Sequence, residues 1–175
     1  MTAESTVTAD LDQATHVGTI SFARGRRNYF DVSLLEAIAD GIEQVAADGA
    51  RAVVLRSTAK HFCAGLDVTR RPDGGRHVYD VVPRLFRVSV PLVAAIHGAA
   101  VGGGLGLALA CDFRVADPSA RFAANFARIG FTQGFALTLT LPAVVGGQRA
   151  ADLLYTGRRV SGTEALGIGL CDRLG

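Results

Sequence analysis

Two glycine-containing segments place backbone amides, rather than reactive side chains, where chemistry could occur. The first is HFCAGLD at residues 61–67, and the second is GAAVGGGLG at residues 98–106. A glycine turn that leads into a helix aims unbonded N–H groups at one point, and the helix dipole adds to their positive potential. Two such N–H groups from separate loops could polarise a carbonyl oxygen and stabilise an oxyanion. Either segment taken alone is more often a solution to a packing problem.

The glycine spacing does not fit the common nucleotide-binding motifs. Counted from Gly102 or Gly104, the third glycine of a dinucleotide fingerprint would have to be Leu107 or Leu109. No Gly-Lys-Ser/Thr follows, as a P-loop requires, and the chain contains neither a G-x-S-x-G elbow nor an H-E-x-x-H motif. The glycines therefore indicate a different use of the backbone.

The composition is that of one globular domain. The 175 residues are 49% hydrophobic, enough to bury a sizeable core, and the net charge of +2 indicates no nucleic-acid partner. Three cysteines without a C-x-x-C pair indicate neither a disulfide framework nor a zinc site. The polar, acidic start resembles no signal or transit peptide, so we expect a cytoplasmic protein without a metal.

One stretch, residues 92–111, is long enough to cross a bilayer, and His97 is its only strongly polar residue. Three consecutive glycines, residues 102–104, lie in its middle, and Gly and Ala supply most of the segment. This composition favours a strand, a glycine turn and a buried helix. A membrane helix is the less favoured alternative. It stays open because membrane helices tolerate glycine.

The elements that must position these segments follow from hydrophobic periodicity. Strands are predicted at residues 14–23, 51–56, 91–96 and 113–115, with a brief further one from Phe122. Helices are predicted at residues 33–48, 77–88, 134–145 and 148–154, and after the glycine turn. Ser33 with Glu36 and Ser161 with Glu164 predict N-terminal caps, and Gly49 a helix end. Alternating strands and helices predict an α/β fold.

Four segments in this order resemble the crotonase (enoyl-CoA hydratase/isomerase) superfamily. HFCAGLD resembles the family's F-x-A-G-x-D, and PLVAAIHGAAVGGGLG at residues 91–106 resembles P-x-I-A-A-V-x-G-x-A-x-G-G-G. RRNYFDVSLL at residues 26–35 and TGRRVSGTEALGIGLCDRL at residues 156–174 resemble the family's opening and later motifs. The resemblance implies a crotonase-like spiral core of repeated ββα units.

The same resemblance bears on domains and assembly. We expect residues 1–13 to form a polar N-terminal tail and residues 14–175 to form the crotonase-like core. Family members continue with helices that close the acyl pocket and help to form trimers, so we expect this C-terminal helical region to be absent from the chain. The expected assembly is a homotrimer or hexamer, with no membrane partner.

The resemblance implies an oxyanion hole formed by the backbone N–H groups of Leu66 and Gly103. Further residues are implied to bind an acyl-CoA thioester, the last two near its phosphates: Ala64, Gly65, Asp67, Val68, Gly102, Arg26 and Arg27. No separate cofactor is expected, because coenzyme A is part of the substrate.

Two glutamates that family hydratases use to position water align here with Gly106 and Phe126, which cannot transfer a proton. We expect both residues, with Gln133, to line the substrate site. Tyr79 lies where another branch carries an active-site histidine and is a candidate for proton transfer, although a structural tyrosine is the favoured interpretation. The expected function is an acyl-CoA enzyme that stabilises a thioester enolate. Alternatives are a noncatalytic acyl-CoA binding or assembly subunit, decarboxylation, and thioester hydrolysis.

Overall fold

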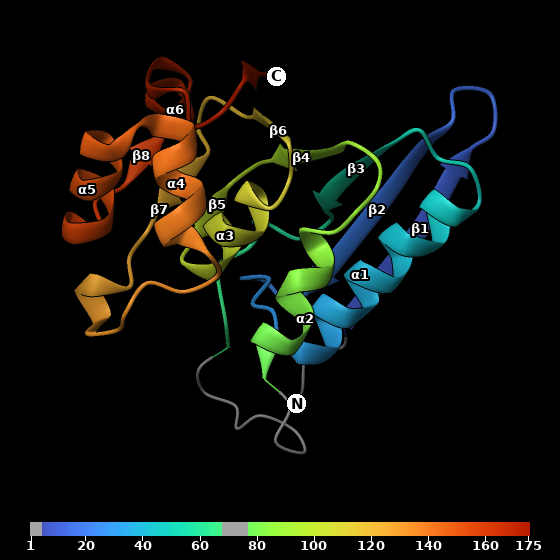
Figure 1. The fold of residues 1–175 in the computed structure, drawn as a ribbon, viewed down its shortest axis with the longest axis horizontal. Coiled ribbons are helices and arrows are strands. Elements are labelled where there is room, and N and C mark those ends of the chain that lie inside the picture. The colour runs from blue at the N-terminus through green and yellow to red at the C-terminus, as the bar shows by residue number, and fades with distance from the viewer. Residues whose placement is uncertain (1–4, 68–76) are drawn as a thin grey trace.

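A computed structural model describes residues 5–67 and 77–175 (Figure 1). One sheet has six strands, namely β1 (Ser5–Asp12), β2 (Val17–Arg24), β3 (Ala52–Ser57), β4 (Leu92–Ile96), β6 (Phe113–Ala116) and β9 (Arg173–Leu174), in that order. The second sheet consists of β5 (Ala99–Val101), β7 (Arg121–Ala123) and β8 (Val160–Ser161). In the larger sheet β1 pairs antiparallel with β2 and the other pairs are parallel.

Helices connect the parallel strands, which confirms the predicted α/β fold. They are α1 (Val32–Ala47), α2 (Val78–Leu85), α3 (Gly103–Leu109), the 3-10 turn η2 (Ala127–Ile129), α4 (Leu137–Val145), α5 (Gly147–Thr156) and α6 (Gly162–Ile168). Figure 1 shows α1 and α2 beside the first strands, with α4, α5 and α6 gathered at the other end and α3 between the two groups.

Helix α1 buries the periodic face that its sequence predicts, from Leu34 to Val45. Its cap differs from the prediction, because Oδ1 of Asp31 accepts hydrogen bonds from the Leu34 amide at 3.0 Å and from Oγ of Ser33 at 2.9 Å. A carboxylate two residues earlier thus takes the capping role, and the predicted Ser33–Glu36 box is wrong. Gly49, with φ of +103°, follows the helix end as predicted.

Residues 5–12, which lie in the predicted polar tail, form the edge strand β1 and pair along the whole of β2. Only Val7 and Leu11 of this strand pack against the core. An edge strand with one covered face requires few apolar side chains, so its sequence is mostly polar. The pairing with β2 supplies the order that composition alone does not predict.

Residues 92–111 form β4, β5 and α3, which confirms the predicted strand, glycine turn and buried helix. Every residue of α3 is buried. Among the helices of the described residues, none has the length and apolar character needed to span a bilayer. Farther along, Ser161 caps α6 by accepting from the Glu164 amide at 3.1 Å, as predicted.

Helix α4 begins at Leu137, three residues after the predicted start at Gly134. The cause is the backbone at Phe135 and Ala136, which have φ of +54° and +57°. Two successive non-glycine residues in the left-handed region cannot continue a right-handed helix. The residues before α4 therefore form a tight turn that leads away from η2.

Candidate functional site

Backbone hydrogen bonds join the two glycine-containing segments directly. The Cys63 amide donates to the carbonyl of Ala99 at 2.9 Å, and the Val101 amide donates to the carbonyl of Cys63 at 3.0 Å. Cys63 and Ala100 thereby form an isolated parallel bridge. The loop at residues 61–67 is thus held against β5, immediately before the glycine turn.

The other edge of the same loop pairs with the residues that precede α1. The Phe30 amide donates to the carbonyl of Gly65 at 2.9 Å, and the Asp67 amide donates to the carbonyl of Phe30 at 3.0 Å. In such a parallel bridge the amide of the intervening residue points away from the partner strand. Within the described part of the chain, the Leu66 amide donates no hydrogen bond.

The second predicted donor lies at the start of α3. The Gly102 amide is used by the carbonyl of Ala123 at 2.8 Å, whereas the Gly103 amide has no acceptor among the described residues. Gly103 is the first residue of the helix, where amides lack intrahelical partners. A β-carbon built on Gly65 would lie 3.6 Å from the Gly103 nitrogen, so the two loops are in contact at this point. The structure therefore brings the two unbonded amides to adjoining backbone.

Close contact between the loops requires a glycine at position 104. A β-carbon there would overlap the carbonyl group of Cys63. The same carbonyl accepts the hydrogen bond from Val101 and so cannot move without breaking the bridge between the loops. Gly104 is therefore needed for the distance between the two segments, independently of any chemistry.

A buried asparagine, Asn28, holds the loop at residues 61–67 by hydrogen bonds from its side chain. Asn28 is fully buried, has φ of +52°, and its Oδ1 accepts a hydrogen bond from the Arg24 amide at 2.7 Å. Its Nδ2 donates to the Phe62 carbonyl at 2.6 Å and to Oγ of Ser57 at 2.9 Å. Asn28 thus connects the ends of β2 and β3 to the loop that carries Leu66.

The buried guanidinium of Arg24 forms ion pairs with aspartates on both sides of the Phe30–Leu66 bridge. Its Nη2 lies 3.0 Å from Oδ2 of Asp31 and 3.5 Å from Oδ2 of Asp67. Asp67, a predicted substrate-binding residue, therefore contributes to the position of the loop through its side chain. The predicted residues Arg26 and Arg27 are exposed on the preceding turn, and Nη1 of Arg27 donates to the Tyr29 hydroxyl at 3.3 Å.

Among the other predicted residues, Ala64 is half-buried beside Gly65, and its amide donates to the carbonyl of Arg27 at 3.2 Å. Val68 lies outside the described residues. At the start of the loop, burial foremost and then the charge of Lys60 lower the pKa of His61. Burial also raises the pKa of the Cys63 thiol to about 12, so this thiol is protonated and is no nucleophile.

Aromatic rings surround the glycine turn. A β-carbon on Gly102 would lie 3.6 Å from Cε2 of Phe126, and one on Gly134 would lie 3.3 Å from Cε1 of the same ring. The Tyr79 hydroxyl contacts the same point at Gly134. The Tyr79 side chain is half-exposed, and its ring contacts that of His77 at a tilt of 39°, with 4.7 Å between the centroids. The structure thus brings Gly102, Phe126 and Tyr79 together on one side of the glycine turn.

The loop at residues 130–136 contributes less polar chemistry than the sequence suggested. Nε2 of Gln133 donates to the carbonyl of Leu154 at 2.8 Å, which directs this end of the side chain toward α5. Phe135 packs against Gly106 and makes an edge contact with Phe30, with centroids 5.6 Å apart. Sequence reasoning missed Phe30 and Phe135, because their apolar side chains carry no signal of proximity to a site.

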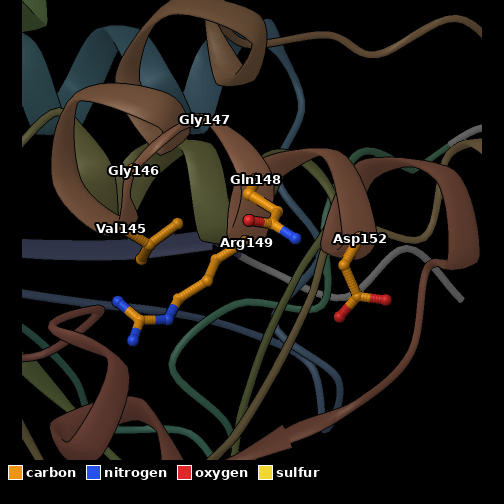
Figure 2. A pocket seen from close by; sticks show the side chains of 6 residues that line it. All are labelled: Val145, Gly146, Gly147, Gln148, Arg149 and Asp152. Atoms are coloured by element: carbon orange, nitrogen blue, oxygen red, sulfur yellow. The ribbon is translucent and has the colours of Figure 1, made fainter.

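A separate hollow of about 590 Å³ lies where α4 passes into α5 (Figure 2). Its lining residues are Val145, Gly146, Gly147, Gln148, Arg149 and Asp152. None of the residues predicted for the site is among them, and Oδ2 of Asp152 is bound by Nε of Arg158 at 2.8 Å. This hollow is therefore distinct from the paired amides.

The structure is thus an α/β protein in which two backbone amides without an acceptor among the described residues lie on adjoining loops. Comparison with known proteins places it more closely: the chain belongs to the enoyl-CoA hydratase/isomerase family, whose sequence model matches residues 12–174. This membership confirms the crotonase resemblance.

Individual relatives agree with this assignment. The chain is 38% identical over 187 residues to an enoyl-CoA isomerase/hydratase of Zymoseptoria tritici, covering 97% of this chain and 61% of that protein. It is 36% identical over 136 residues to an enoyl-CoA isomerase/hydratase of Mycosarcoma maydis, covering 71% and 48% of the two chains. The chain thus spans about three fifths of the first relative's length.

Solved structures confirm the crotonase-type fold. An enoyl-CoA hydratase subunit I of Geobacillus kaustophilus superposes with a TM-score of 0.87 at 31% identity, covering 96% of this chain and 68% of that one. An enoyl-CoA hydratase/isomerase of Pseudoalteromonas atlantica superposes with a TM-score of 0.87 at 32% identity, with 96% and 68% covered.

Proposed function

We propose that the protein binds an acyl-CoA thioester and holds its carbonyl oxygen between the N–H groups of Leu66 and Gly103. The observation that supports this is the pair of unbonded amides on loops that backbone hydrogen bonds lock together. When a base removes the proton from the carbon next to the thioester, the electron pair moves onto the carbonyl oxygen. Two fixed donors stabilise that charge, and removal of one such donor typically slows a reaction about 10²–10³-fold.

The proposal includes the loss of both hydratase carboxylates, at Gly106 and Phe126. Phe135 packs against Gly106, and position 126 itself carries a phenyl ring; such rings neither accept a proton nor bind water strongly. General acid–base assistance is typically worth about 10²–10⁴ for each group. We therefore expect slow hydration of crotonyl-CoA even where the thioester binds well.

Tyr79 is the proposed proton-transfer residue. Its hydroxyl contacts Gly134 beside the ring of Phe126, on the side of the glycine turn that also includes Gly102. Its half-exposed position leaves it accessible to substrate. Replacement of Tyr79 by Phe removes only the hydroxyl, so acyl-CoA binding should persist while turnover falls.

A noncatalytic acyl-CoA binding or assembly subunit is the second candidate. It is favoured by the residues at positions 106 and 126, since glycine and phenylalanine leave donors for a carbonyl oxygen without a carboxylate at either position. Decarboxylation and thioester hydrolysis would use the same donors. Binding and turnover, measured on one panel of saturated, unsaturated and malonyl-type thioesters, separate these functions. We also propose that the complete protein is a homotrimer or hexamer, which light scattering tests.

The donors themselves are tested by replacing Leu66 with its α-hydroxy acid analogue, which exchanges the N–H for an oxygen. This amide has no acceptor in the described structure, so its loss breaks no hydrogen bond, and stability should fall only because the ester makes the Gly65 carbonyl a weaker acceptor for the Phe30 amide. Turnover should fall about 10²–10³-fold. The same replacement at Asp67 is the matched control, since its amide is bonded to Phe30 and its loss should lower stability. Unchanged turnover of the Leu66 analogue on an active substrate would refute the oxyanion role.

A further inference from the structure

Gly106 and Phe135 are in unusually close contact. A β-carbon built on Gly106 would lie 2.5 Å from Cβ of Phe135, 2.6 Å from its Cγ and 2.7 Å from its Cδ1. Gly106 stands three residues after Gly103, so the two glycines lie on the same face of α3. Phe135 therefore occupies the volume that a side chain one turn after the proposed donor would need.

Phe135 has little freedom to move aside. It is 2% exposed, and its backbone, like that of Ala136, is held in the left-handed region at the start of α4. Its ring packs edge-on against Phe30, which is 1% exposed. A β-carbon on Gly103 would lie 2.5 Å from Cζ of Phe30, so Phe30 is itself confined by the start of α3 and leaves Phe135 little room.

We propose that Gly106 and Phe135 act as one reaction-determining pair. A carboxylate on α3 would reach the acyl group from the space beside residue 106. Gly106 places no side chain in that space, and Phe135 fills it. Neither substitution alone would introduce a working carboxylate. A larger residue at position 106 collides with Phe135, and a smaller residue at position 135 leaves only a void. The assignment to reaction type rests on the proposed acyl-CoA function, whereas the pairing itself does not.

A stability cycle tests the pairing without any ligand. Alanine is normally the better helix former, so Gly106→Ala would raise the melting temperature if space were available. In the otherwise unchanged protein we expect Gly106→Ala to lower it by roughly 5 °C or more. Phe135→Ala retains the β-carbon nearest to residue 106, and the loss should persist in that background.

Phe135→Gly removes that β-carbon and also suits the positive φ at position 135. In this background Gly106→Ala should leave the melting temperature unchanged or raise it. An unchanged or higher melting temperature for Gly106→Ala alone would overturn the pairing, even if Phe135→Gly does not fold. The same conclusion would follow if the loss persisted in the Phe135→Gly background.

The role in the reaction is tested by hydration of crotonyl-CoA in the complete protein. Gly106→Glu combined with Phe135→Gly should hydrate it at least about tenfold faster than Phe135→Gly alone. Gly106→Glu with Phe135 retained, or with Phe135→Ala, should show no gain. A confirmed stability cycle without this gain, in variants that bind crotonyl-CoA, would overturn the reaction-determining role. Failure of the unsubstituted protein to bind any thioester would instead refute the proposed function.

Discussion

Replacement of Asn28 by Ala tests whether one buried amide holds the loop that carries Leu66. Asn28 has 0% exposure, and its side chain bonds the Arg24 amide at 2.7 Å and the Phe62 carbonyl at 2.6 Å. Alanine removes both of these bonds, together with the bond to Oγ of Ser57, and supplies no polar group in their place. The loop would then keep its bonds to β5 and Phe30 and the Arg24–Asp67 ion pair, but lose the buried amide that joins it to the ends of β2 and β3.

The expected magnitude follows from the partners left behind. A buried donor or acceptor that loses its partner costs about 1–3 kcal/mol, so the Arg24 amide and Phe62 carbonyl together cost about 4 kcal/mol. Alanine adds about 1 kcal/mol because φ at this position is +52°. For a domain of this size, about 5 kcal/mol corresponds to a fall of roughly 10–20 °C in melting temperature.

Thermal unfolding followed by circular dichroism measures this loss, and Asn28→Gly is the matched control. Glycine tolerates the positive φ but also lacks the amide, so it should lose about 1 kcal/mol less than alanine. Hydrogen exchange should report faster opening of the Cys63 and Asp67 amides in both variants. If Asn28→Gly melted within about 2 °C of the unsubstituted protein, the amide network would not be what holds the loop.

Three further outcomes follow from local packing and charge. Gly104→Ala should lower the free energy of unfolding by more than about 3 kcal/mol, measured by urea denaturation, because its β-carbon overlaps the Cys63 carbonyl. Burial raises the pKa of the Cys63 and Cys111 thiols to about 12, so a thiol reagent at pH 8 should label them only after denaturation; rapid labelling of the native protein would contradict this burial. Burial lowers the pKa of His61 below its ordinary value near 6.5, so the unfolded chain binds more protons and stability should fall as the pH drops below about 6.5. An NMR titration midpoint for His61 at 6.5 would show no pH dependence from this group, and one above 6.5 would show the reverse sign.

The sequence predicted those features that follow from local pattern. The apolar period of α1, the strand-turn-helix at residues 92–111 and the cap at Ser161 all depend on nearby residues, and the structure confirms them. The proximity of the two glycine segments came from the family resemblance, because neither periodicity nor composition specifies which loops meet.

Features that depend on distant contacts were not predictable in this way. Asp31 takes the cap of α1 because it also pairs with Arg24, which fixes its position. The left-handed backbone at Phe135 is stabilised by packing on Phe30 and α3, and its sequence reads as ordinary helix. The fit of Phe135 over Gly106 is likewise a matter of tertiary packing, which a one-dimensional pattern cannot contain.

The parallel bridges on both edges of the loop at residues 61–67 bear on mutational robustness. Because the Leu66 and Gly103 amides belong to the main chain, only proline removes either N–H group directly, and other substitutions act on them by shifting the backbone, as Gly104→Ala would. The groups that move protons have no such protection, since one codon change removes a carboxylate or a hydroxyl. Under the proposed function, chemistry in this scaffold can therefore diverge by exchange of side chains such as Tyr79 and Phe126, while the two proposed donors are inherited with the backbone.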